Sequence, residues 1–206
     1  MSNNSVKIRK MVILAMLTAV IILMTFTPLG YLKLPFVEIS FLMLPVALGA
    51  ILLGPVAGAI LGTVFGITSF IQCFGASALG AMLLSINPLL TFLVCVPTRI
   101  LAGWLTGLVF QAIYRAEAKR EKKHLLSFGA ASLCAPIFNT LFFMGTLTAC
   151  FYQTDYIQGF VKTLGAANPI MFIILFAGIN AAVEIAVGFL VGSVITKAVY
   201  NVVQKG

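Results

Sequence analysis

The sequence predicts an all-α integral membrane protein: a compact bundle of six transmembrane helices, with both termini in the cytoplasm and a single domain over residues 1–206. Composition is the first reason, because 61% of the residues are hydrophobic and only 9% are charged, whereas soluble domains carry roughly 25% charged residues. The second is a series of apolar segments of membrane-spanning length. The third is the clustering of basic residues in short stretches between those segments.

Six apolar segments are assigned as helices. They cover about residues 11–29, 39–53, 55–74, 87–113, 127–151 and 169–198. The first follows Lys7, Arg9 and Lys10 and resembles the start of a signal peptide. It is nevertheless long enough to span a bilayer and lacks a small-residue cleavage site, so we expect a retained helix. The second is short and ends at Gly54-Pro55, and we expect it to be buried among its neighbours or to be tilted little in the membrane.

The orientation follows from the basic residues, which accumulate on the cytoplasmic side of membrane proteins. With a cytoplasmic amino terminus and six alternating spans, ten of the 13 basic residues face the cytoplasm, two face outward and Arg99 lies within a span. The ten are Lys7, Arg9, Lys10, Arg115, Lys119, Arg120, Lys122, Lys123, Lys197 and Lys205. Both termini are therefore predicted to be inside, and the polar stretch 114–126 is predicted to extend a helix into the cytoplasm.

The net charge of +8 does not indicate a nucleic-acid partner, because the basic residues flank apolar segments and form no recognition surface. The sequence contains neither a nucleophile elbow nor a phosphate-binding loop, so we expect no enzyme activity in this chain. His124 is its sole histidine and has no second ligand candidate nearby, so neither a metal site nor a cofactor is expected.

Four cysteines lie in or at the edge of the apolar segments: Cys73, Cys95, Cys134 and Cys150. None forms a Cys-x-x-Cys pair, and we expect all four to pack as small buried hydrophobic side chains. A disulfide between Cys73 and Cys150 is the alternative, because both residues fall near the same membrane face in the predicted topology.

Glycine spacing and the outer segments predict tight packing and a covered pocket. Glycines recur every four residues at Gly54, Gly58, Gly62 and Gly66, and at the same spacing at Gly103 and Gly107 and at Gly188 and Gly192. Small residues at this spacing let two helices approach closely in lipid. The predicted outer segments, 30–38, 74–86 and 152–168, are apolar and rich in small and aromatic residues. They suit lids over a pocket, and poorly ordered connections are the alternative.

Arg99 and Glu184 are the two charges inside the predicted spans. A charge at such depth costs several kcal/mol to insert, so it generally marks a functional site. At 1.5 Å per residue, Arg99 lies roughly 18 Å and Glu184 roughly 22 Å from the outer ends of their helices. Asn139 lies at a similar depth, and Asn180 is one turn from Glu184 on the same helix face.

These polar groups must satisfy one another or bind a ligand. The Arg99 guanidinium is suited to a carboxylate or phosphate, and Glu184 can accept from hydroxyls or amides or neutralise Arg99. The pattern predicts a site for a small polar solute that carries an acid group and enters from outside. An Arg99–Glu184 pair that only fixes helix packing is the alternative. The predicted binding residues are Arg99, Asn139, Asn180 and Glu184, with Asn87 and Gln72 nearer the outer surface.

Several local motifs are shared with a known family. They are the basic amino terminus leading into Ala15-x-x-x-Ala19, the segments Leu34–Ser40 (LPFVEIS) and Leu52–Gly58 (LLGPVAG), and the basic connection between the fourth and fifth segments. In these the chain resembles a substrate-binding S component of an energy-coupling factor (ECF) vitamin transporter. The resemblance implies six helices in the cell membrane and high-affinity binding of a vitamin near the outer face. It also implies docking on a transmembrane coupling protein with two cytoplasmic ATPase subunits. Ala15 and Ala19 would contact the coupling protein, and residues 30–38 would gate the site.

The substrate expected from the predicted pocket is pantothenate, which has a carboxylate, an amide and two hydroxyls. Riboflavin or folate is the alternative, with Phe74, Phe142, Phe143 and Tyr152 as stacking partners. An alternative from another class is a non-transport structural membrane protein of cell-wall morphogenesis. Such a protein would have a filled core around Arg99 and no ligand.

Overall fold

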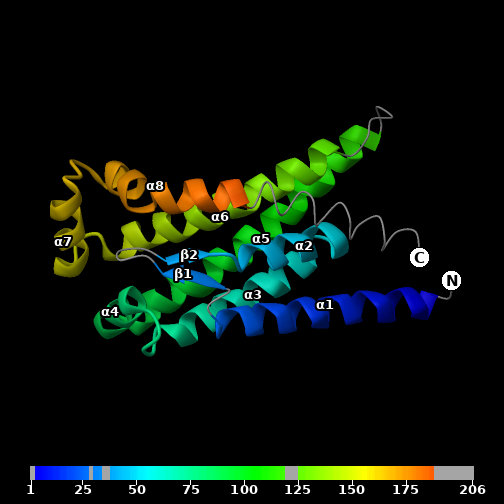
Figure 1. Ribbon diagram of the computed structural model, residues 1–206, viewed down its shortest axis with the longest axis horizontal. Helices are drawn as coiled ribbons and strands as arrows, with labels where there is room; N and C mark the ends of the chain where they lie inside the picture. The colour runs from blue at the N-terminus through cyan, green and yellow to red at the C-terminus, as the bar shows by residue number, and fades with distance from the viewer. Residues whose placement is uncertain (1–2, 28–29, 34–37, 119–124, 188–206) are drawn as a thin grey trace.

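The computed structural model describes residues 3–27, 30–33, 38–118 and 125–187. Within these ranges it describes the backbone alone at residues 3, 32–33, 38–39, 125–126, 179–181 and 187. The long helices run side by side along one axis (Figure 1). The described elements are α1 (Asn3–Thr25), β1 (Tyr31–Lys33), β2 (Glu38–Ser40), α2 (Met43–Leu53), α3 (Pro55–Gln72), α4 (Ala78–Ile86), α5 (Pro88–Ala118), α6 (Leu125–Phe151), α7 (Asp155–Leu164) and α8 (Pro169–Val187).

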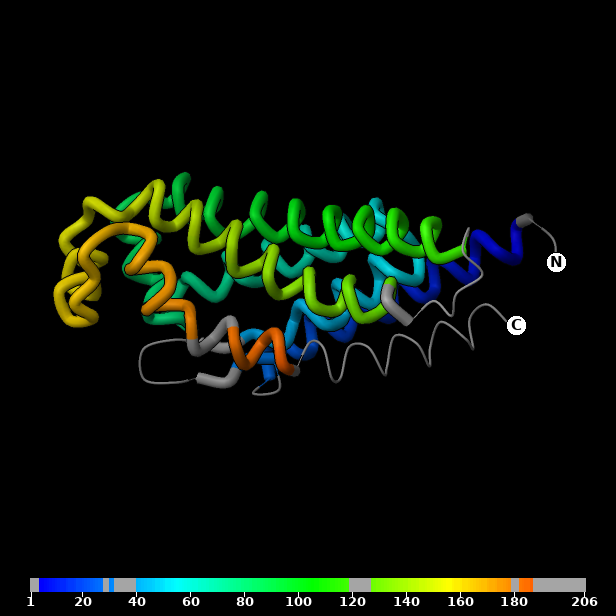
Figure 2. Tube along the Cα trace, turned by 90° about the horizontal axis from the view of Figure 1, so that it is seen from above, coloured from blue at the N-terminus to red at the C-terminus, as the bar shows by residue number. Residues whose placement is uncertain are grey.

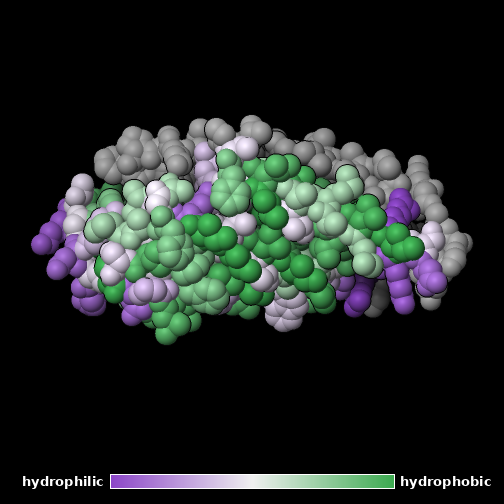
Figure 3. All heavy atoms as spheres, turned by 90° about the horizontal axis from the view of Figure 1, so that it is seen from below, coloured by the Kyte–Doolittle hydropathy of each residue, from purple (hydrophilic) through white to green (hydrophobic). Residues whose placement is uncertain are grey.

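Four of the described helices are long and apolar enough to cross a membrane: α1, α3, α5 and α6. A fifth span results if α7 and the first part of α8, bent by 75° relative to each other, are counted together. The helix α2 is too short by the same criterion, and the predicted continuation of the last span over 188–198 lies outside the described residues. Hydrophobic atoms cover the middle of the molecule and hydrophilic atoms gather at its two ends, as expected for a membrane protein (Figure 3). Six spans and two cytoplasmic termini stay a prediction.

The boundary between the second and third predicted segments is confirmed at Gly54-Pro55. Gly54 has φ +98°, a backbone conformation that side chains rarely allow, and Pro55 occupies the first turn of α3. Met43, Val46 and Ala50 of α2 are buried, so the short helix is enclosed by its neighbours as predicted.

The second predicted segment was placed too early, because residues 38–40 form a strand. β1 and β2 pair antiparallel, with Tyr31 opposite Ser40. This small hairpin adds two three-residue strands to an otherwise helical fold and delays the helix to Met43. An apolar stretch of this length does not distinguish strand from helix by itself, and the pairing partner lies in the preceding segment.

The predicted glycine contact joins α3 to α5. A Cβ added at Gly58 would lie 2.3 Å from the carbonyl oxygen of Gly103, and one at Gly62 would lie 2.3 Å from the carbonyl oxygen of Arg99. Both distances are too short for any side chain. The absence of side chains at these positions therefore lets the two backbones touch, and it fixes the level at which Arg99 sits.

We expect Gly62→Ala to lower the melting temperature of the purified protein in detergent. The added methyl collides with the α5 backbone, and overpacking of this kind costs about 1–3 kcal/mol. Gly145→Ala in α6 is the matched control, because nothing lies within 4 Å of its Cβ position and the gain in helix propensity is the same. Equal melting temperatures for the two variants would contradict the prediction.

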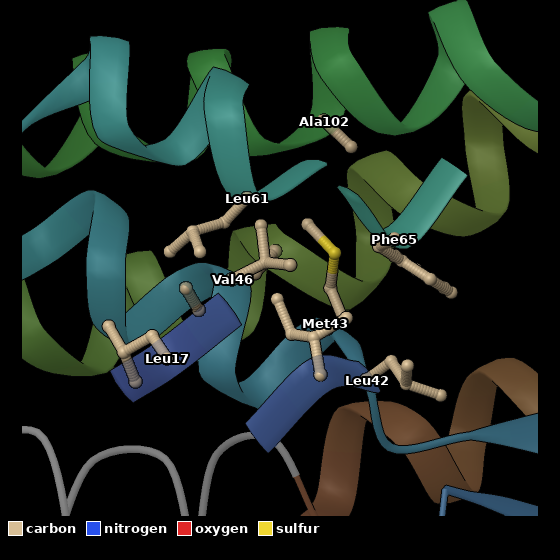
Figure 4. Close-up of a cluster of buried hydrophobic side chains, with 10 residues drawn as sticks. Leu17, Leu42, Met43, Val46, Leu61, Phe65 and Ala102 are labelled. Atoms are coloured by element: carbon tan, nitrogen blue, oxygen red, sulfur yellow. The ribbon is translucent and has the colours of Figure 1, made fainter. Parts of the chain in front are cut away.

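The core and the predicted outer segments lie at different levels of the bundle. A cluster that includes Leu17, Val46, Leu61 and Ala102 joins α1, α2, α3 and α5, and Phe65 closes it at one side (Figure 4). The helices α4 and α7 cover the end of the molecule that lies opposite the start of α1 (Figures 1 and 2). The segments predicted as lids over a pocket therefore contain a hairpin and two short helices.

Candidate functional site

A cavity of about 400 Å³ lies where the hairpin, α4 and α7 meet the long helices. Its walls include side chains from β1, β2 and every helix from α3 to α8. Binding sites for small molecules commonly have volumes of about 300–1,000 Å³. Three of the predicted binding residues with described side chains in the spans line it: Arg99, Asn139 and Glu184.

Arg99 is held in the cavity wall by its own helix and by two aromatic rings. A helical side chain leans toward the amino-terminal end of its helix, and Nη1 of Arg99 donates to the carbonyl oxygen of Val94 at 2.7 Å and to the hydroxyl of Thr98 at 3.2 Å. The guanidinium carbon lies 4.2 Å from the ring centroid of Phe143 and 5.4 Å from that of Phe65. These contacts stabilise the buried cation.

The turn of α5 around Arg99 carries additional side-chain hydrogen bonds. Pro97 lies within α5 and has no backbone N–H, so the carbonyl oxygen of Leu93 lacks its usual helical donor. The carbonyl oxygen of Val94, the next residue, accepts from two side chains, because Thr98 Oγ1 and Arg99 Nη1 both donate to it.

Glu184 connects α8 to the hairpin. Its Oε1 accepts a hydrogen bond from the backbone N–H of Ser40 at 2.9 Å. The carboxylate also interacts electrostatically with Arg99 and with the side-chain amide of Asn139. Among the described side chains, Glu184 and Arg99 lie near each other but form no direct ion pair, since Arg99 donates to its own helix and Glu184 accepts from the hairpin.

Some buried side-chain atoms have no hydrogen-bond partner in the described part of the chain, and three of them belong to cavity-lining residues on different helices: Nε of Arg99, Oδ1 of Asn139 and Oε2 of Glu184. Their residues are only 6%, 7% and 8% exposed. An unsatisfied buried polar group costs about 1–3 kcal/mol. Such groups are rare in folded proteins and call for an explanation, and three along one cavity indicate a site that takes a polar ligand.

The other predicted site residues have different positions. Gln72 lines the cavity and its Nε2 donates to the carbonyl oxygen of Thr25 at 2.7 Å. Asn87 is not among the residues that line it; its Oδ1 accepts from the backbone N–H groups of Leu89 and Leu90 and so caps α5. Asn180 lies in α8, one turn before Glu184, and its side chain is outside the described part of the structure.

Sequence reasoning named some of the cavity aromatics and missed others. Phe143 lines the cavity and lies four residues after Asn139, on the same helix face. Phe65 was not predicted, although it follows Gly62 by three residues and therefore lies near its face. Phe74 is 70% exposed, and Tyr152 packs edge-on against Phe172.

The cysteines pair differently from the predicted alternative. The Sγ atom next to Cys73 is that of Cys95, at 3.9 Å, and no bridge to Cys150 is formed. Cys73 and Cys95 are both buried, as predicted, whereas Cys134 and Cys150 are half-buried. In the parts of the chain that the structure describes, no cluster of three or more His, Cys, Asp or Glu side chains could hold a metal ion.

Residues 9–196 match the family model described as "ECF transporter, substrate-specific component". No curated protein matches the chain in sequence. Components of this kind are binding subunits of a transporter and not enzymes, and they work with a membrane coupling protein, ATPases and a small-molecule substrate. Since the match covers most of a chain rich in apolar helices, this is a multi-pass protein of the plasma membrane, and it belongs to the family of substrate-specific components of ECF transporters.

Proposed function

We propose that this subunit captures a small water-soluble vitamin with high affinity from outside the cell, and that its substrate is pantothenate. It does so as a six-span bundle with both termini in the cytoplasm. The observation that carries the proposal is a set of three buried polar atoms along the cavity for which the described residues offer no hydrogen-bond partner: Arg99 Nε, Asn139 Oδ1 and Glu184 Oε2.

The hydrogen-bonding chemistry of these three atoms limits which groups the solute must carry. Arg99 Nε–H needs an acceptor, whereas Asn139 Oδ1 and Glu184 Oε2 each need a donor. A carboxylate satisfies the first, and hydroxyl or amide groups satisfy the other two. Pantothenate carries all of these groups, so its acid end is assigned to Arg99 and its donors to Asn139 and Glu184.

The ring positions favour pantothenate over riboflavin or folate. Phe65 and Phe143 are the rings closest to the cationic centre, and both already contact the Arg99 guanidinium. A flavin or pterin that stacked on these faces would displace that cation. Tyr156 and Phe160 also line the cavity, so both larger vitamins belong in the binding test.

The hairpin is proposed to act as the gate. Ser40 in β2 and Tyr31 in β1 line the cavity, and the hairpin is tied to α8 by the Ser40–Glu184 hydrogen bond. Breaking this bond would release β2 from α8. The carboxylate that holds the hairpin also presents its second oxygen toward the solute, so binding and gating would share Glu184.

A thermal-shift series with pantothenate, riboflavin and folate on the purified protein tests the function. We expect a rise in melting temperature with pantothenate, and mass spectrometry of the extracted protein should find the same compound. Stabilisation by riboflavin or folate alone would replace pantothenate as the substrate. Failure of all three vitamins to stabilise the protein would reject pantothenate, riboflavin and folate as substrates.

Ala15 and Ala19 of α1 are proposed to dock on the transmembrane coupling protein. Both are exposed, and the same helix presents exposed Met16 and Leu23, at 65% each. Small residues one turn apart permit a close approach by a second helix.

We expect Ala15→Trp to prevent co-purification with the coupling protein while leaving vitamin binding unchanged. The bulky ring would hold the partner helix away from α1, and position 15 lies far along α1 from the hairpin. Val20→Trp is the control, because Val20 is also exposed and lies on a different helix face from Ala15 and Ala19. Equal loss of the complex in both variants would reject the specific role of this face.

A further inference from the structure

Two thiols face each other in the wall of the cavity. The Sγ atoms of Cys73, at the carboxyl end of α3, and of Cys95, on α5, lie 3.9 Å apart. Both residues line the cavity and are only 4% exposed. The cavity is therefore the side from which a small reagent would reach the pair.

Close packing keeps the two sulfurs together. A Cβ added at Gly80 of α4 would lie 2.6 Å from Cys73 Sγ, and one at Gly66 of α3 would lie 2.8 Å from the Cα of Val96, the residue after Cys95. A disulfide has an S–S distance of about 2.05 Å, so the sulfurs would need to approach by roughly 1.9 Å. Side-chain rotation at the end of α3 can supply much of this movement.

The surroundings of this pair differ from those of the other cysteines. The Arg99 guanidinium interacts electrostatically with Cys95. Reactive thiols are found beside cations in accessible sites, whereas thiols buried in apolar surroundings are inert. Cys134 and Cys150 are not among the cavity-lining residues.

We propose that Cys73 and Cys95 form a dithiol modification site, which a small-molecule disulfide entering the cavity converts into an intramolecular disulfide. One protein thiolate attacks a sulfur of the reagent, which forms a mixed disulfide and releases one small thiol. The second protein thiol then attacks the mixed disulfide and releases the other small thiol. The two cysteines lose two electrons and two protons, and the reagent disulfide is reduced to two thiols. The reaction is independent of which solute the transporter carries.

The test treats the full chain in detergent with 4,4′-dithiodipyridine and follows release of 4-thiopyridone, the intact mass and the cysteine peptides. A Cys134→Ser/Cys150→Ser background leaves only the pair. We expect two thiopyridones released for each protein, no pyridyl group retained, a mass lower by two hydrogen atoms, and a Cys73–Cys95 peptide. Retention of pyridyl groups on both cysteines would reject the proposal, as would no reaction.

Single cysteine replacements test whether the second cysteine of the pair resolves the mixed disulfide. In the same background, Cys73→Ser or Cys95→Ser should release one thiopyridone and retain one pyridyl group on the remaining cysteine. A single variant that still loses its pyridyl group would contradict the intramolecular step. If the serine variants fail to fold, peptide mapping of the oxidised wild-type protein decides alone: a Cys73–Cys95 peptide supports the proposal, and any other pairing overturns it.

Discussion

Arg99→Ala is expected to weaken the binding of pantothenate strongly. Removing one partner of a buried, charge-assisted hydrogen bond costs about 2–5 kcal/mol, and 1.4 kcal/mol is a factor of ten in affinity. The dissociation constant should therefore rise roughly 30-fold to 3,000-fold, as measured by calorimetry on the purified protein. Arg99→Lys should recover only part of this loss, because a lysine keeps the charge without the planar fork.

The control for this prediction is Arg115→Ala. Arg115 lies in the last turn of the same helix and is exposed, so its removal changes the net charge equally without altering the cavity. We expect no change in affinity for this variant. Unchanged affinity in Arg99→Ala itself would return Arg99 to a packing role.

The depth of the site could be predicted because helical rise is constant. Counting residues from Asn87, Phe151 and Pro169 placed Arg99, Asn139 and Glu184 near one level, and the structure brings these three residues to one cavity. The helix starts at Pro55 and Pro169 were also predictable, since proline favours the first turn of a helix.

Long-range pairing and side-chain rotamers could not be predicted in the same way. The hairpin depends on Tyr31 meeting Ser40, and no local pattern encodes that register. The hydrogen bond from the backbone N–H of Ser40 to the carboxylate of Glu184 joins residues that lie 144 positions apart. The capping role of Asn87 could have been predicted from local sequence. An asparagine immediately before a proline that starts a helix is typical of an N-cap, whereas the prediction considered only the depth of Asn87 in the membrane.

Glu184→Gln is expected to weaken pantothenate binding while preserving the hairpin contact. Glutamine keeps one carbonyl oxygen, which can still accept from the backbone N–H of Ser40. Its amide group replaces Oε2 by a donor, which then faces the donor of the solute. The lost hydrogen bond to a charged group costs about 1.5–3 kcal/mol, so affinity should fall roughly 10-fold to 150-fold.

Glu184→Ala removes both the acceptor for the hairpin and the acceptor for the solute. Comparison with Glu184→Gln therefore separates the two roles. Without any acceptor, the Ser40 amide loses its partner and should exchange its hydrogen faster than in the wild-type protein or in Glu184→Gln. Hydrogen exchange of the peptide that contains Ser40, measured without solute, reports the hairpin contact, and calorimetry reports the solute. Asn168, which caps α8 through Met171 at the start of the same helix, provides a control in Asn168→Ala, where neither quantity should change.

The two variants decide between three roles for one carboxylate. Normal affinity with fast Ser40 exchange in Glu184→Ala would mean that Glu184 only holds the hairpin. Weak binding with unchanged exchange would mean that it only contacts the solute. Loss of both in Glu184→Ala, with loss of binding alone in Glu184→Gln, is the expected pattern. It follows from the positions of the two oxygens: Oε1 accepts from the backbone of β2, and Oε2 has no hydrogen-bond partner among the described residues. A solute donor that reaches Oε2 would then bind the same carboxylate that holds β2 against α8.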